Sequence, residues 1–156
     1  MMENRFMKAA IDIAIAGMEM GKGGPFGAVV VCNGEIIAAA SNEVLSSNDP
    51  TAHAEINAIR RACEKLGSFQ LSGCELYTTC EPCPMCMGAI YWARPSIVYF
   101  AATREDAAAA GFDDSLIYRE IAVTNEERKI PFVRLLDPGA VHLFALWNNS
   151  PLKKNY

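Results

Sequence analysis

The chain has 156 residues, of which 51% are apolar and 21% charged, and it carries a formal net charge of −4. This length and composition are typical of one folded domain with its own core, spanning residues 1–156. The acidic balance and the lack of a Lys/Arg cluster exclude a typical nucleic-acid-binding surface, and no apolar run is long enough to span a membrane. We therefore expect neither nucleic acid nor a membrane as a partner.

The cysteines and the N-terminal sequence bear on the cellular compartment. The sequence does not begin with the charged and then apolar segment of an export signal. In such a chain, cysteines indicate thiols and a metal site rather than disulfides, and we expect a cytoplasmic protein. The six cysteines are Cys32, Cys63, Cys74, Cys80, Cys83 and Cys86.

The first third of the chain predicts a helix followed by a β-hairpin. Apolar residues recur at helical spacing over residues 4–21 and predict an amphipathic helix, which a glycine-rich stretch ends. Two apolar segments, 26–32 and 35–40, flank Asn33-Gly34, which is the signature of a hairpin with a primed turn. The polar segment 41–51 then predicts a loop, where functional side chains tend to lie.

The rest of the chain alternates between predicted helices and strands. Asp49-Pro50 has the pattern of a helix start, with a capping oxygen followed by proline in the first turn. Pro131 restricts the last predicted strand to the edge of a sheet. The further predicted elements are a strand at 74–79, a helix from Pro82-Pro84 to residue 93, a strand at 96–101, a helix at 115–121, a strand at 130–136 and a helix from Asp137 to residue 148.

Two short motifs carry the strongest chemical signal. One is His53-x-Glu55, and the other is Cys83-x-x-Cys86 with Pro82 directly before it. Taken together, in this order, they form the H-x-E…P-C-x-x-C signature of zinc deaminases. The sequence therefore predicts that His53, Cys83 and Cys86 bind zinc.

The spacing of these residues also predicts where they lie in the fold. Cys83 and Cys86 are three residues apart and share one side of a first helical turn, where the helix dipole favours thiolates. His53 and Glu55 would point about 200° apart in the middle of a helix, because a turn takes 3.6 residues. They can converge only where a helix begins, so we expect two helix N-termini to face one another.

The motif residues suffice for a hydrolytic deamination. Two thiolates and a neutral imidazole leave one zinc position open to water, whose pKa zinc lowers to near 7. Glu55, outside the coordination shell, can take the water proton and deliver it to a ring nitrogen and then to the leaving amine. A purely structural site, closed by Cys80 as a fourth ligand, is the alternative, and it leaves Glu55 without a role.

Beyond the motifs, the chain resembles two nested families. The order of motifs and elements resembles the cytidine-deaminase-like superfamily, which implies an α/β fold: a three-layer α/β/α sandwich with a five-stranded mixed sheet. Five further segments resemble the bacillus-type guanine deaminases in order and chain length. These segments are Gly23–Ala28, Ser47–Glu55, Tyr91–Pro95, Ala110–Asp114 and Lys153–Tyr156.

The closer resemblance implies that guanine is converted to xanthine and ammonia. It implies catalytic roles for Glu55 and Asp114, the latter as a second proton carrier at the base edge. It also implies that Asn42 hydrogen-bonds the purine and that Phe26 and Trp92 flank its faces. The full set of implied substrate contacts is Phe26, Asn42, Ala54, Trp92, Asp114 and Tyr156.

The resemblance further implies one zinc per subunit and a homodimer. In this dimer the C-terminal segment, about 137–156, is exchanged between subunits, so that Tyr156 reaches the partner's site.

Several alternatives stay open at the level of sequence. Asn42 could be a turn residue, Phe26 and Trp92 core aromatics, Asp114 a helix cap and Tyr156 a frayed terminus. The competing functions are deamination of another purine, of a nucleoside or pyrimidine, or of tRNA adenosine, and a zinc-stabilised binding module without catalysis.

Overall fold

The computed structural model describes residues 4–156. The chain divides into two compact units, Met1–Asp114 and Ser115–Tyr156, which are described separately below. No helix within residues 4–156 has both the length and the apolar character needed to cross a membrane.

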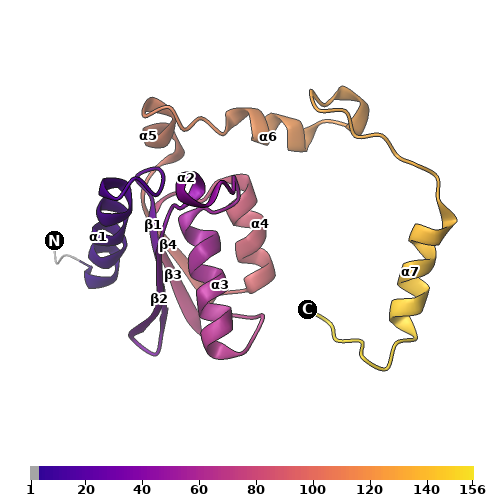
Figure 1. The fold of residues 1–156 in the computed structure, drawn as a ribbon, viewed down its shortest axis with the longest axis horizontal. Helices are drawn as coiled ribbons and strands as arrows, with labels where there is room; N and C mark the ends of the chain where they lie inside the picture. Colours follow the sequence, from indigo (N-terminus) through magenta and orange to yellow (C-terminus); the bar gives the residue numbers. More distant parts are fainter. Residues whose placement is uncertain (1–3) are drawn as a thin grey trace. The chain divides into compact units, whose positions relative to one another are not determined.

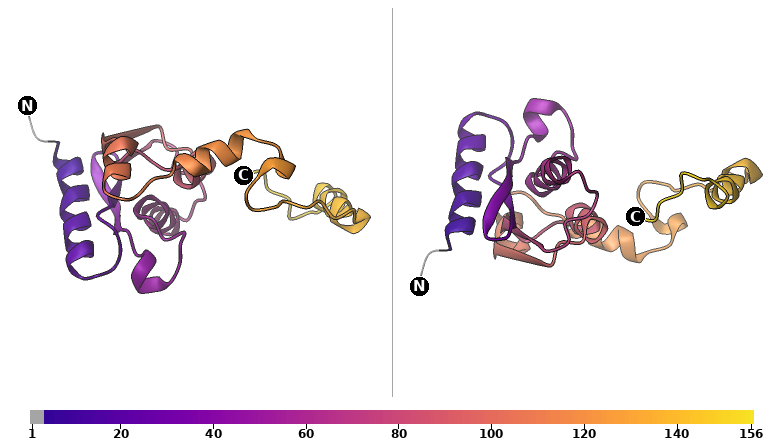
Figure 2. Two further views of the ribbon diagram at one scale, coloured as in Figure 1. Left: turned by 90° about the horizontal axis from the view of Figure 1, so that it is seen from above. Right: turned by 90° about the horizontal axis from the view of Figure 1, so that it is seen from below.

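The first unit is a mixed sheet with helices on both faces (Figure 1, Figure 2). The strands are in the order β2-β1-β3-β4, with β3 and β4 parallel and the other neighbours antiparallel. Helix α1 lies on one face and helices α3 and α4 on the other. The bounds are α1 Arg5–Glu19, β1 Gly27–Cys32, β2 Glu35–Ser41, α3 Ala54–Leu66, β3 Cys74–Cys80, α4 Pro84–Ala93 and β4 Ile97–Ala102.

Strand β1 is central to the core because both of its faces are covered. Successive side chains of a strand point to opposite faces. Ala28 and Val30 therefore pack in the cluster that includes α3, and Val29 and Val31 pack in the cluster that includes α1. This explains why the strand is apolar along its length rather than alternating.

The hairpin prediction is confirmed, and two neighbouring predictions need correction. Asn33 and Gly34 have φ values of 52° and 76°, as a primed turn requires. The predicted loop over residues 41–51 contains a short helix, α2 (Val44–Ser47). The helix predicted from Asp49-Pro50 begins only at Ala54, because the Asp49 carboxylate accepts hydrogen bonds from the N–H and hydroxyl of Thr51 in a turn.

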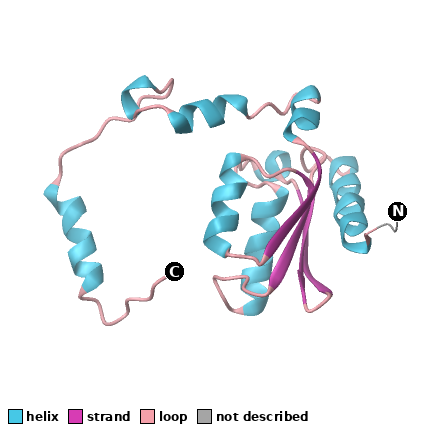
Figure 3. Ribbon diagram, turned by 180° about the vertical axis from the view of Figure 1, so that it is seen from behind, coloured by secondary structure: helices cyan, strands magenta, loops and turns pink. Residues whose placement is uncertain are grey.

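The predicted five-stranded sheet is wrong for this structure, which has four strands among the described residues (Figure 3). The missing strand is 130–136, which forms neither strand nor helix. Its apolar side chains, such as Val133 and Leu135, are exposed, and a strand is stable only when it pairs with an edge. Helix α5 (Arg104–Ala109) was not predicted, although its capping box, Thr103-x-x-Asp106, is a recognisable start signal.

The expectation of thiols alone is also wrong. Cys32 and Cys74 are Cα partners on the neighbouring strands β1 and β3, and they form a disulfide with a Cα separation of 4.4 Å. The pairing depends on the strand register, which the sequence spacing of these two residues does not reveal. The other four cysteines are free.

The second unit contains three helical segments. They are α6 (Ser115–Ala122), the short 3-10 helix η1 (Asn125–Glu127) and α7 (Pro138–Asn148). The helices α6 and α7 were predicted from the sequence. Asp137 caps α7 by accepting a hydrogen bond from the N–H of Gly139 at 2.8 Å. The apolar side chains of α7 are exposed, including Leu143, Phe144 and Trp147.

Candidate active site and metal centre

Two helix N-termini supply the residues of the predicted zinc motif. His53 is the N-cap of α3 and Cys83 is the N-cap of α4, and both have extended backbone conformations. Glu55 and Cys86 follow within the first turns of these helices. Because the chain is extended before each helix, side chains that would diverge on a continuous helix can converge, as the spacing predicted.

Three of these side chains form a compact donor group. His53 Nδ1 lies 3.6 Å from Cys83 Sγ and 3.4 Å from Cys86 Sγ, and all three atoms lie within 4.8 Å of one another. One imidazole and two thiols are donors that zinc prefers, and three protein ligands leave a tetrahedral position open. Cys80 is outside this group and donates from Sγ to the Thr103 carbonyl at 3.5 Å. The arrangement fits a reactive site better than a closed structural one.

The protonation of the two thiols is coupled. A hydrogen bond from Cys86 is the main reason that the pKa of the Cys83 thiol falls to about 4. The same bond, together with burial, raises the pKa of Cys86. The pKa of His53 is raised, first by its hydrogen bond to Cys83. Zinc binding would require both thiols to be deprotonated, because zinc ligands are thiolates.

Glu55 is a buried carboxyl group beside these donors. It is only 6% exposed, and its pKa is raised, mainly because burial disfavours the charged form. A buried carboxyl group next to a metal-binding donor group is a common arrangement for a general acid or base. The position of Glu55 thus suits proton transfer.

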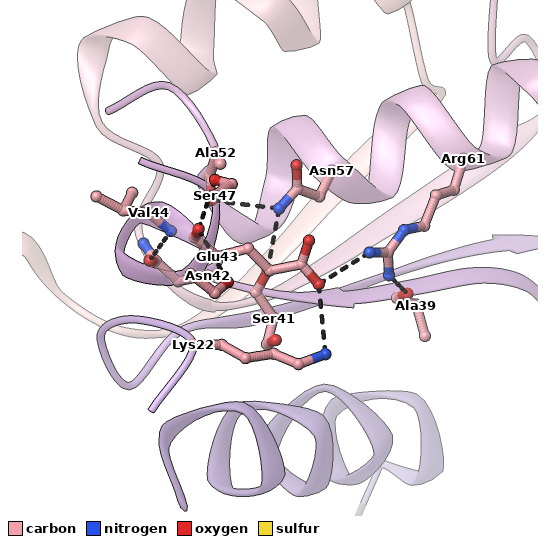
Figure 4. A network of polar contacts seen from close by, with 11 residues as sticks. Lys22, Ala39, Ser41, Asn42, Glu43, Val44, Ser47, Ala52, Asn57 and Arg61 are labelled. Atoms are coloured by element: carbon pink, nitrogen blue, oxygen red, sulfur yellow. Dashed lines mark hydrogen bonds and ion pairs between the residues drawn. The ribbon is translucent and has the colours of Figure 1, made fainter. Parts of the chain in front are cut away.

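Asn42 lies buried at the start of the loop that leads from β2 toward His53. Its backbone N–H donates to the Phe26 carbonyl at 2.9 Å, and its Oδ1 accepts from the N–H of Val44 at 3.1 Å (Figure 4). A Cβ atom at Gly23 would collide with Asn42 Oδ1, so glycine is required there by close approach. The side chain of Asn42 is therefore closely held from two sides.

Phe26 packs against the segment that contains Asp114. The rings of Phe26 and Phe112 meet edge to face, with centroids 4.9 Å apart, and Gly24 lies against both. Asp114 is half-buried, and its pKa is raised by burial and then by the negative charge of Cys83, which places it near the donor group. Phe112 was not predicted as a site residue, although it lies within the Ala110–Asp114 segment.

The remaining predicted site residues differ in their placement. Ala54 is fully buried and follows His53 as the first residue of α3. Trp92, near the end of α4, is 64% exposed in this chain. Tyr156 belongs to the second unit and is exposed. Of the predicted contacts, Ala54 is adjacent to His53 in the chain and Asp114 lies near Cys83. Asn42 and Phe26 are hydrogen-bonded to one another, and Trp92 is exposed.

Comparison with known proteins agrees with this geometry. Residues 1–102 match the family model of the cytidine and deoxycytidylate deaminase zinc-binding region. The chain is 56% identical over 151 residues to guanine deaminase of Bacillus subtilis (strain 168), covering 97% of each chain. It is similar to the X-ray structure of guanine deaminase from Bacillus subtilis with a TM-score of 0.95 and 55% identity over 99% of both chains.

Two more distant relatives indicate the breadth of the similarity. The structure of guanine deaminase from Nitrosomonas europaea matches with a TM-score of 0.66 and 36% identity, covering 70% of this chain and 63% of that one. The tRNA-specific adenosine deaminase of Aquifex aeolicus (strain VF5) is 47% identical over 97 residues, covering 62% of this chain and 64% of that protein.

Proposed function

This chain belongs to the cytidine and deoxycytidylate deaminase zinc-binding family, and we propose that it deaminates guanine to xanthine and ammonia by zinc-dependent hydrolysis. The observation that supports guanine as the substrate is the 56% identity to a guanine deaminase over 97% of the chain. The observation that carries the chemistry is the donor group of His53, Cys83 and Cys86 beside a buried Glu55.

In this proposal His53 Nδ1 and the sulfurs of Cys83 and Cys86 hold one zinc ion per subunit. When bound, zinc supplies a Lewis acid that lowers the pKa of water. A Glu55 carboxylate oxygen accepts a proton from the attacking water and transfers it to a purine ring nitrogen. Glu55 then takes the remaining proton of the added oxygen and passes it to the amine, so that the carbonyl of xanthine forms, the C–N bond breaks and ammonia leaves. Asp114 serves as a second proton carrier at the base edge.

The proposed substrate contacts are those that the resemblance to guanine deaminases implies. In them Asn42 hydrogen-bonds the purine, and Phe26 and Trp92 cover its two faces. The N–H of Ala54 lies in the first helical turn, where amides lack an intrahelical partner and can donate to a bound carbonyl. Tyr156 completes the site by contacting the base.

A homodimer with exchanged C-terminal segments, about 137–156, is part of the proposal. Its support is the exposed apolar surface of α7, since large exposed apolar surfaces on a chain mark sites of association. In the dimer, Tyr156 of one subunit would serve the site of the other.

Release of ammonia from a panel of compounds tests the substrate. The zinc-loaded protein is incubated with guanine, guanosine, adenine, cytosine and cytidine, and we expect ammonia from guanine. Ammonia from cytidine but not from guanine would overturn the substrate assignment. No ammonia release from any of the five compounds would favour the non-catalytic binding module.

Deamination of tRNA adenosine is the second candidate, favoured by the 47% identity to a tRNA-specific adenosine deaminase. The net charge of −4 opposes it, because binding of a tRNA backbone needs a basic surface. A tRNA anticodon stem-loop added to the same panel decides between the two, since inosine formation with no reaction of guanine would select this candidate.

Deletion of residues 151–156 tests the role proposed for the tail. We expect zinc to be retained and kcat/KM for guanine to fall, because Tyr156 is lost. If activity on guanine is unchanged, the tail is not part of the site. Sedimentation of the full chain tests the dimer separately, and a monomer would exclude the exchange.

A further inference from the structure

The side chain of Asn57 joins the chain segments that carry the ligand His53 and the substrate contact Asn42. Asn57 is the fourth residue of α3 and is only 8% exposed. Its Nδ2 donates to the carbonyl of Ser41 at 3.3 Å and to that of Ala52 at 3.2 Å (Figure 4). Ser41 directly precedes Asn42, and Ala52 directly precedes His53. One amide group therefore ties the two segments together.

Backbone bonds strengthen the same connection. Glu43, the residue after Asn42, donates its N–H to the Ala52 carbonyl at 2.9 Å, so this oxygen accepts from both Glu43 and Asn57. The backbone N–H of Asn57 donates to the His53 carbonyl at 3.0 Å. Ser41 and Glu43, the residues on both sides of Asn42, are thus hydrogen-bonded to Asn57 and to Ala52, which directly precedes His53.

The chemistry of the contact requires an amide. Both partners of Nδ2 are carbonyl oxygens, which only accept hydrogen bonds, and an Asn side chain supplies two N–H donors from one nitrogen. Aspartate has the same shape but would present a carboxylate oxygen to these carbonyls. Serine has one donor on a shorter side chain and cannot reach both. Loss of the amide therefore removes one hydrogen bond from each of the Ser41 and Ala52 carbonyls, although Ala52 keeps the bond from Glu43.

We propose that Asn57 is a positioning residue, whose side-chain amide holds Asn42 at the separation from His53 that the substrate ring needs. The inference rests on the proposed function, because it assigns Asn42 to the purine and His53 to zinc. Asn57 contacts neither substrate nor metal in this role and acts only through the carbonyls of Ser41 and Ala52.

The test compares Asn57→Asp and Asn57→Ser with the wild type and with Ile59→Val. Ile59 lies on the same helix within the hydrophobic core, so its substitution lowers stability without removing a bond to the Asn42 loop. For each full-length protein we measure zinc per chain, the thermal midpoint, kcat and KM for guanine, and the inhibition constant of xanthine. Inhibition by the product reports on binding independently of turnover.

We expect all four proteins to hold zinc, because the three ligands are intact. Both Asn57 variants should raise KM for guanine and the inhibition constant of xanthine in parallel, by about tenfold, since buried hydrogen bonds of this kind are worth about that factor. Ile59→Val should lower the thermal midpoint and leave both constants at their wild-type values. That contrast separates positioning from general stability.

Three outcomes overturn the inference. One is an unchanged KM for guanine and an unchanged inhibition constant of xanthine in a folded Asn57 variant. If Asn57→Asp does not fold, Asn57→Ser provides this measurement. Another is an equal rise in both constants in Ile59→Val. The third is failure of both Asn57 variants to fold, which makes the residue purely structural. An inert wild type refutes the proposed function and this role with it, whereas an active wild type with unaltered Asn57 variants refutes only the role.

Discussion

His53 Nδ1 lies 3.4 Å from Cys86 Sγ, although 33 residues separate the two in sequence. The short distance arises because α3 and α4 both begin at this place, with His53 and Cys83 as their N-caps. Helix N-termini favour nearby negative charge, which suits the Cys83 thiolate at the first residue before α4. The metal centre therefore depends on two helix starts rather than on one continuous segment.

The ligand set predicts opposite results at two neighbouring cysteines. Cys83→Ala should lose zinc, because only two of the three donors remain, whereas Cys80→Ala should keep about one zinc per chain. Metal content of the purified proteins, measured by mass spectrometry, checks both. Loss of zinc from both variants would mean that Cys80 is also a ligand, and this result would contradict the catalytic interpretation.

Replacement of the buried carboxyl group should separate metal binding from catalysis. Glu55→Gln keeps the shape but cannot transfer the proton, so kcat for guanine should fall by about 10²–10⁴-fold with zinc retained. Glu64→Gln, an exposed position on the same helix, is the matched control and should keep wild-type kcat. A Glu55→Gln protein with near-normal kcat would assign the proton transfer elsewhere.

Close packing at Gly23 should matter to substrate binding. Gly23→Ala places a methyl group against Asn42 Oδ1 and displaces that side chain, so KM for guanine should rise about tenfold, equivalent to about 1.4 kcal/mol. Steady-state kinetics on Gly23→Ala, Asn42→Ala and the double variant check the cause. The added methyl group would also lie 2.8 Å from the Asn42 backbone carbonyl oxygen, which remains in Asn42→Ala. The double variant should therefore be worse than Asn42→Ala but less than additive, and full additivity would show that the glycine substitution does not act through the Asn42 side chain.

The phenol of Tyr77 should make stability depend on pH in the alkaline range. Burial, followed by a hydrogen bond to Glu75 at 2.7 Å, raises the pKa of Tyr77 to about 12. In the unfolded chain the phenol loses its proton near pH 10. This contribution to stability is therefore fully present below about pH 10 and is lost as pH rises to about 12.

Urea unfolding between about pH 9 and about pH 12 measures this effect. The wild type should lose stability more steeply with pH than Tyr77→Phe, which lacks the titrating group. Parallel curves for the two proteins would show that Tyr77 does not contribute to the alkaline transition.

The disulfide between Cys32 and Cys74 should stabilise the fold without affecting the metal. It closes a loop with a sequence separation of 42, and its loss should cost about 2–4 kcal/mol. Thermal or urea unfolding with and without a phosphine reductant checks this. The wild type and Cys63→Ser should respond to the reductant, and Cys32→Ser should not. A wild type that is indifferent to reductant would mean that the pair is present as two thiols.

The sequence by itself determined the features that depend on local spacing. Asn33-Gly34 predicted the hairpin because its positive φ values are a property of those two residues and their neighbours. His53, Glu55, Cys83 and Cys86 were predicted as one site because they match the H-x-E…P-C-x-x-C signature, and their spacing predicted that they converge at helix starts. A closed site with Cys80 as a fourth ligand was disfavoured because it leaves Glu55 without a role.

Tertiary structure alone decided the features that depend on which segments meet. Asp49 bonds Thr51 in a turn, which moves the helix start to Ala54 and leaves His53 as its cap. Strand register places Cys32 opposite Cys74, and no spacing rule relates two residues on neighbouring strands. The strand predicted at 130–136 lacks a pairing partner in this structure, and the bonds from Asn57 to Ser41 and Ala52 form because a helix, a strand end and a loop pack together. Local sequence specifies conformation, but only packing specifies contacts between segments.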